Sequence, residues 1–191
     1  MILIFLGPPG SGKGTQAKLL AEKLKIAHIS LGDLLREEVR IGSAIGKQAK
    51  AMMDAGKLVP DELTIELAQN RIKKDDCRRG FIMDGFPRSA AQAEAFDKML
   101  AQNKLSLNAA VYFAVEEEAL VKRLLLRAEI EGRADDNEKV IRTRFEVYGK
   151  QTAPLIEHYK KMGKLVEIDA ARPIDQVTKE LFELEAIASV L

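Results

Sequence analysis

The sequence predicts an α/β protein: a parallel sheet of about five strands, flanked by helices. Short apolar runs alternate along the 191 residues with longer segments whose apolar residues recur at three- and four-residue spacing, the pattern of strands joined by crossover helices. The runs are continuously apolar, as expected of strands buried on both faces of a sheet. A chain of this length is enough for one well-buried domain and too short for two ordinary ones.

The candidate strands are the five apolar runs, at residues 2–6, 26–29, 81–83, 109–115 and 164–168. Helical spacing is clear between them, for example at Leu120 and Leu124. A later helical pattern runs from Ile141 to Thr152 and meets Pro154. Because proline has no amide donor, we expect the helix to kink there or to start again.

Two stretches interrupt the alternation of strands and helices. Residues 31–79 have a helical pattern and no strand, and residues 127–137, "RAEIEGRADDN", are polar and contain a glycine. Both are typical of appendages that move relative to a sheet.

Composition excludes several classes of function. The formal net charge is +1, so there is no global basic field to attract nucleic acid or a membrane surface. No apolar run approaches the length of a membrane span, and the apolar start is too short for a signal sequence. The one cysteine, Cys77, excludes an internal disulfide and a cysteine-rich zinc cluster. We therefore expect a cytoplasmic protein with no nucleic-acid or membrane partner.

A glycine-rich loop, "GPPGSGKGTQ", occupies residues 7–16 between the first strand and the first helix. Its glycines allow backbone amides to point inward as a concave site for anionic oxygens, and the helix that follows adds free amides at its positive end. Lys13 supplies a full charge for the β- and γ-phosphates of a nucleoside triphosphate. The loop residues expected to bind this donor nucleotide are Gly10, Ser11, Gly12, Lys13, Gly14 and Thr15.

The loop departs from the usual pattern at Gly14, where a hydroxyl residue normally follows the lysine. Either Thr15 reaches the phosphates instead, or the Mg²⁺ ion that accompanies the nucleoside triphosphate is held by phosphate oxygens, water and a carboxylate elsewhere. The second possibility predicts an aspartate at the carboxyl end of a neighbouring strand, where ligands of such sheets bind. Asp84 closes the strand 81–83. It is the candidate for Mg²⁺, held through water.

With these motifs, the chain resembles the adenylate kinase family of nucleoside monophosphate kinases. The form of its glycine loop is the family's own, and "GDLLR", "GKLVPDELT", "GFIMDGFPRSAAQAE" and "GRADDNEKVIRTR" match further signatures in order. The resemblance runs nearly end to end. It implies a P-loop NTPase-type fold, a monomer, and Mg²⁺-dependent transfer of the γ-phosphoryl group of ATP to AMP, giving two ADP.

The resemblance also implies a division of the chain into three parts. The core would be residues 1–29, 75–126 and 138–191, with a nucleoside-monophosphate (NMP) segment at 30–74 and a lid at 127–137. The lid has the short form of the family. It lacks the inserted hairpin of the long form and its zinc-binding cysteines, so no structural zinc is expected.

The resemblance assigns the arginines to the two phosphate chains. Arginine suits this task because its planar fork binds phosphate bidentately and stays charged. Arg123 and Arg127 lie four residues apart and share a helix face. Arg36 and Arg88 match ligands of the AMP phosphate. The groups that close on ATP and the transferred phosphoryl group are matched by Arg123, Arg127, Arg133 and Arg144. Arg172 lies in the stretch 169–175, which is expected to cradle the donor adenine. Catalysis would rest on position and charge, with the catalytic set Lys13, Asp84, Arg88, Arg123, Arg133 and Arg144.

For the acceptor base, Gln92 lies four residues after Arg88 and matches the residue that reads adenine in the family. The AMP site implied by the resemblance comprises Leu31, Arg36, Gly56, Lys57, Leu58, Val59, Gly85, Arg88, Gln92, Arg133 and Arg144. Leu31 departs from the family, which has threonine there. Loss of that hydroxyl weakens the case for strict AMP specificity.

Other functions remain open at this point. A UMP/CMP-type or broad-specificity kinase is the alternative within the class, although Gln92 favours adenine. A nucleotide-dependent switch or a non-catalytic nucleotide-binding module would be a different class. Gly14, the lack of an N-K-x-D guanine motif and the second set of arginines argue against the switch. A non-catalytic module would be expected to have lost some of Lys13, Arg88 or the lid arginines, and none is missing. His28 and His158 fall in no motif and are interpreted as structural.

Overall fold

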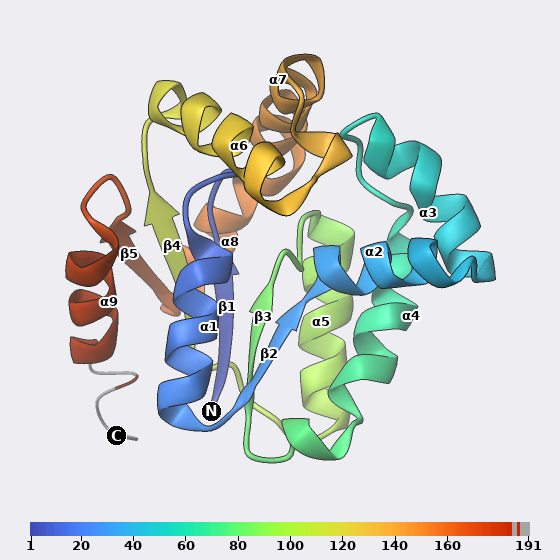
Figure 1. The fold of residues 1–191 in the computed structure, drawn as a ribbon. Helices are drawn as coiled ribbons and strands as arrows, with labels where there is room; N and C mark the ends of the chain where they lie inside the picture. Colours follow the sequence, from blue (N-terminus) through green and yellow to red (C-terminus); the bar gives the residue numbers. More distant parts are fainter. Residues whose placement is uncertain (185–186, 188–191) are drawn as a thin grey trace.

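The computed structural model describes residues 1–184 and Ile187; the end of the predicted core, residues 185–186 and 188–191, lies outside the described residues. Five parallel strands form one sheet in the order β2-β3-β1-β4-β5 (Figure 1). The α/β class and the parallel sheet are therefore confirmed. The strands are β1 (Ile2–Leu6), β2 (Ala27–Ser30), β3 (Phe81–Asp84), β4 (Ala109–Ala114) and β5 (Leu165–Asp169).

Two strands begin and end one residue later than their apolar runs, because backbone pairing rather than side-chain polarity sets their ends. β2 pairs with β3 from Ala27 opposite Phe81 to Ser30 opposite Asp84. The polar Ser30 thus belongs to the strand. β5 likewise extends to Asp169, which pairs with Ala114.

The helices pack on both faces of the sheet and across its carboxyl edge (Figure 1). On one face, Leu3 and Phe5 share a buried cluster with Leu20 of α1 and Leu181 of α9. On the other, Ile4 packs with residues of α5 and α8. The helices are α1 (Lys13–Leu24), α2 (Leu31–Ile41), α3 (Ala44–Asp54), α4 (Asp61–Ile72), α5 (Ala90–Gln102), α6 (Glu117–Glu131), α7 (Glu138–Val147), α8 (Pro154–Lys161) and α9 (Ile174–Glu183), with short helical turns η1 (Asp75–Cys77), η2 (Ala134–Asp136) and η3 (Tyr148–Thr152).

Local sequence explains where the helices around the site begin. At the starts of α2 and α5, the Ser30 and Ser89 hydroxyls each accept a hydrogen bond, at 3.2 Å, from the backbone amide three residues later in the chain. Asn137 caps α7 in the same way. The last helical pattern starts again at Pro154, as predicted, after a turn of π-helix at η3.

The NMP segment forms α2, α3 and α4 beside the β2 edge, whereas α6 and α7 lie across the carboxyl end of the sheet, joined by η2 (Figure 1). α6 continues to Glu131, so Arg127 of the predicted lid is helical. The NMP segment approaches α7 closely at Gly56, where an added Cβ would lie 2.9 Å from Val140 and 3.0 Å from Arg144. Among the described residues, no helix is long and apolar enough to span a membrane.

Candidate active site

A cavity of about 830 Å³ opens at the carboxyl end of the sheet, between the glycine loop, the NMP segment and α6–α7. The strand order places this cavity beside β1 and β3, where the direction of the connections reverses and where ligands of such sheets bind. Every site residue predicted from the sequence lines it. The structure thus brings together side chains from residue 10 to residue 172; their individual roles remain predictions.

The glycine loop wraps around the ammonium group of Lys13. Lys13 Nζ donates to the carbonyl oxygens of Gly7 and Pro8, both at 2.8 Å, and to Ser11 Oγ at 3.1 Å. Gly10 and Gly12 have φ angles of 83° and 90°, a left-handed conformation that glycine adopts without strain. Burial lowers the pKa of Lys13 to about 7, against the opposing effect of Asp84. Anionic phosphates would restore the charged form.

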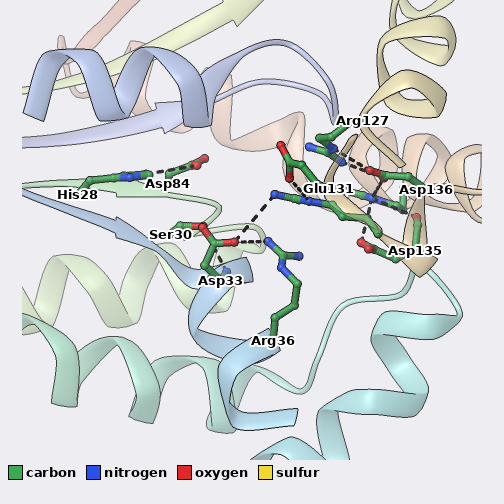
Figure 2. Close-up of polar contacts among 11 residues, drawn as sticks. His28, Ser30, Asp33, Arg36, Asp84, Arg127, Glu131, Asp135 and Asp136 are labelled. Atoms are coloured by element: carbon green, nitrogen blue, oxygen red, sulfur yellow. Dashed lines mark hydrogen bonds and ion pairs between the residues drawn. The ribbon is translucent and has the colours of Figure 1, made fainter. Parts of the chain in front are cut away.

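Asp84 faces Gly14 across the cavity floor. A Cβ at position 14 would lie 3.4 Å from Asp84 Oδ2, so glycine leaves room beside this carboxylate. His28 Nε2 lies 3.6 Å from the same oxygen (Figure 2). Burial alone would raise the pKa of Asp84, but His28, Lys13 and Arg88 outweigh it and lower the pKa. The carboxylate is therefore ionised and available to a cation.

Arg127 of α6 and Arg144 of α7 pair with two aspartates of η2, Asp135 and Asp136; Figure 2 labels Arg127 and both aspartates. Arg127 donates to Asp136 from Nε at 2.7 Å and from Nη2 at 2.8 Å. Arg144 Nη1 donates to Asp136 Oδ1 at 2.5 Å and to Asp135 Oδ2 at 3.1 Å. Both guanidinium groups line the cavity, so incoming phosphates would meet arginines whose positions are already set.

Asp33 of α2 pairs with two arginines (Figure 2). Arg36 Nη2 donates to Asp33 Oδ1 at 2.5 Å, and Arg133 Nη2 lies 3.9 Å from the same oxygen. Arg88 is held separately, because its Nε donates to the carbonyl oxygen of Gly85 at 2.7 Å. Burial, together with the nearby Arg144, lowers the pKa of Arg88 to about 10. An anion beside Arg88 would relieve this unfavourable charge.

Gln92 is 1% exposed and is held by α4 and its own loop. Its Nε2 donates to Asp61 Oδ1 at 2.7 Å and Thr64 Oγ1 at 3.1 Å, and its Oε1 accepts from the Arg88 amide at 2.7 Å. Leu31, 3% exposed, belongs to the buried cluster that includes Val59.

Arg123 donates to the carbonyl oxygens of Ala170 and Ala171 at 3.2 and 3.4 Å, which ties α6 to the loop after β5. Arg172 lies in that loop and pairs with Asp169 and Glu180. Both arginines line the cavity, as does Ile174 of α9.

Several residues that sequence reasoning passed over also line the cavity. His28 was interpreted as structural, yet it lies beside Asp84. Its place near the carboxyl end of a strand is a signal that could have been used. Thr152 Oγ1, from the π-helical turn, donates to the Arg88 carbonyl at 2.8 Å, and no sequence pattern indicated that contact.

A parallel sheet that presents a glycine-rich phosphate loop, facing a second group of arginines in one cavity, defines a P-loop nucleotide phosphotransferase. Comparison with known proteins narrows this class. The family model described as "Adenylate kinase" matches residues 5–164, and the chain belongs to the adenylate kinase family.

Individual relatives agree with this assignment along nearly the whole chain. A protein named adenylate kinase from Thermobifida fusca is 50% identical over 179 residues, covering 94% of this chain and 95% of the relative. One from Stenotrophomonas maltophilia is 49% identical over 177 residues, covering 93% and 95%. One from Archaeoglobus fulgidus is 43% identical over 208 residues, covering 95% and 96%. The chain is thus an enzyme with adenylate kinase function.

Proposed function

We propose that the chain transfers the γ-phosphoryl group of ATP to AMP, reversibly and with Mg²⁺, giving two ADP, and that it prefers AMP to UMP and CMP. The observation that carries this proposal is the meeting of two cationic groups in one cavity. Lys13 and Arg123 come from the glycine loop and α6, whereas Arg36 and Arg88 come from α2 and the loop after β3. Two phosphate-bearing substrates can therefore be held side by side.

The reaction requires position and charge rather than proton transfer. An oxygen of the AMP phosphate attacks the γ-phosphorus as the bond to the β–γ bridging oxygen breaks, and ADP leaves with that electron pair. The attacking oxygen is already anionic, so no general base is needed. Lys13, Arg88, Arg123, Arg133 and Arg144 would orient the phosphates and balance the charge of the transition state.

The residues around Asp84 fit a magnesium ion that arrives with ATP. Mg²⁺ is usually held by one or two carboxylates together with waters and substrate phosphates. In the described part of the chain, no group of three or more histidine, cysteine, aspartate or glutamate side chains could hold a metal by itself. Asp84, ionised beside Lys13 and Gly14, would bind the ion through water. The ion supplies further positive charge for the phosphate oxygens.

The preference for AMP rests on Gln92. Its amide oxygen can accept from the amino group of adenine, and Val59 and the backbone of residues 56–58 line the same cavity. Leu31 contributes only apolar surface there. The donor adenine would lie against the loop 169–175, beside Arg172.

The segments 30–74 and 127–137 would close over the two nucleotides and exclude water. The contact of Gly56 with α7 supports such a closure, because it joins the NMP segment to the helix that carries Arg144. The balanced charge and single cysteine support a cytoplasmic protein that needs no structural zinc, and a monomer is what the family resemblance implies.

The test is formation of nucleoside diphosphate from ATP with AMP, GMP, UMP and CMP in turn. We expect AMP to give the highest kcat/KM. Equal or faster turnover of UMP or CMP would refute the substrate assignment, and ATP hydrolysis that ignores every acceptor would favour a nucleotide switch.

A further inference from the structure

The Gln92 side chain has both of its amide hydrogens engaged before any base arrives. Nε2 donates to Asp61 and Thr64, and Oε1 accepts from the Arg88 amide. A glutamine amide has two N–H donors and an oxygen able to accept two hydrogen bonds. The amide therefore retains one acceptor position and no free donor.

The partners of Gln92 also dictate which way round its amide lies. An ionised carboxylate can only accept, and a backbone N–H can only donate. The reverse orientation would place Oε1 against the Asp61 carboxylate and Nε2 against the Arg88 N–H, losing both 2.7 Å bonds. Asp61 is itself held by Ser89 Oγ, which donates to it at 3.0 Å. The remaining acceptor position suits the exocyclic amino group of a base.

Adenine also carries a ring nitrogen, N1, that accepts, and Gln92 can donate to it only by giving up a bond. The bond to Thr64 is the easiest to release, because it is longer, at 3.1 Å, and joins two neutral groups. Thr64 Oγ1 donates its own hydrogen to the Asp61 carbonyl at 2.9 Å and keeps that bond when Gln92 turns to the base.

We propose that Thr64 is a specificity-determining residue of the acceptor site, because its hydroxyl competes with the ring nitrogen of the base for one amide hydrogen of Gln92. The inference rests on the proposed function above, in which Gln92 reads adenine. Thr64 and Gln92 are 3% and 1% exposed, so a released amide hydrogen has little access to water. The hydroxyl therefore lowers the affinity for AMP. It does not change the affinity for a nucleotide whose base carries a hydrogen on the ring nitrogen.

The test is binding of nucleoside monophosphates to Thr64→Val by titration calorimetry. Valine keeps the shape of the side chain but removes the acceptor, so one buried hydrogen of Gln92 has no partner until a base binds. We expect the Kd for AMP to fall about three- to tenfold. Purine riboside monophosphate, which keeps the ring acceptor, should show a similar gain in affinity for the variant. Inosine monophosphate, whose N1 carries a hydrogen, should bind the variant and the wild type equally well.

Further variants separate competition from a general change in the pocket. Thr64→Ser keeps a hydroxyl and should restore the weaker binding, whereas Thr64→Ala, which also lacks it, should bind AMP more tightly. Thr143→Val is the matched control, because Thr143 Oγ1 donates to a carbonyl of its own helix, that of Lys139, at 3.3 Å. Tighter AMP binding in this control would assign the effect to something other than Gln92.

An unchanged or higher Kd for AMP in Thr64→Val and Thr64→Ala, both folded by circular dichroism, overturns the inference. An equal gain for AMP and inosine monophosphate overturns it as well. A wild-type protein that forms no ADP from AMP refutes the proposed function instead.

Discussion

Arg127 on α6 donates two hydrogen bonds to the carboxylate of Asp136, at 2.7 and 2.8 Å, although Asp136 is fully buried. The same carboxylate accepts from Arg144 on α7. One side chain thus joins α6 and α7, and it holds two arginines that line the cavity.

Replacing Asp136 with alanine should leave two guanidinium groups without their shared anion. Removing one member of a buried ion pair costs about 3 kcal/mol or more, and we expect a loss of this size in the free energy of unfolding by urea. Glu138→Ala is the control, because the Glu138–Arg142 pair is exposed and should cost about 0.5 kcal/mol or less. Similar losses in the two variants would contradict the role of Asp136.

Arg88→Ala should reduce kcat/KM for AMP by about two to three orders of magnitude, because a phosphate ligand of this kind acts in the transition state. Arg88→Lys should recover little of the loss, since lysine cannot bind phosphate bidentately. Arg78→Ala is the control, because Arg78 is 80% exposed and pairs with the exposed Asp75. Near-normal rates for Arg88→Ala would mean that the AMP phosphate lies elsewhere.

The low pKa of Lys13 predicts a pH dependence of stability. Burial lowers the pKa to about 7 in the folded protein, whereas the unfolded chain keeps the ordinary 10.5. Between these values the unfolded state binds more protons, so the contribution of Lys13 makes the folded state more stable as pH rises.

This contribution can be isolated by comparing wild type with Lys13→Met in urea at pH 7, 8 and 9. The stability of the wild type relative to the variant should rise across this range. Saturating ATP should flatten the rise, because phosphates favour the charged lysine. Identical pH profiles without nucleotide would show that Lys13 titrates normally.

Replacing Gly46 should disturb packing rather than catalysis. A Cβ at this position would overlap the backbone carbonyl of Glu38, at the close approach of α3 to α2. Because backbone atoms cannot turn aside, Gly46→Ala should destabilise the protein by about 2 kcal/mol. Gly149→Ala, where a Cβ meets nothing within 4 Å, should be neutral or stabilising by up to about 1 kcal/mol. Thermal melting compares the two, and equal effects would contradict the account of Gly46.

The parts of the fold that were predictable are those that local physics determines. β1 has no exposed residue, and its continuous apolar run and the glycines after it leave few other structures open. The strand end at Asp84 followed from the same logic, because a carboxylate after a buried run must lie at the edge of the sheet.

The pairing of side chains was not predictable in the same way. Arg127 and Asp136 are nine residues apart across a helix end, and nothing local indicates their contact. The Asp61–Gln92–Thr64 network joins residues 28 and 31 positions apart, and it exists only because α4 packs against α5. Resemblance to the family proposed Gln92 as the base-reading residue but did not indicate the neighbours that hold its amide.

The most direct measurement of the central claim follows the γ-phosphorus of labelled ATP when AMP is added to the wild-type enzyme with Mg²⁺. The account predicts that the label appears as the β-phosphate of ADP formed from AMP, with two ADP produced for each ATP consumed. Label released as inorganic phosphate, or ADP formation that is independent of AMP, would contradict it.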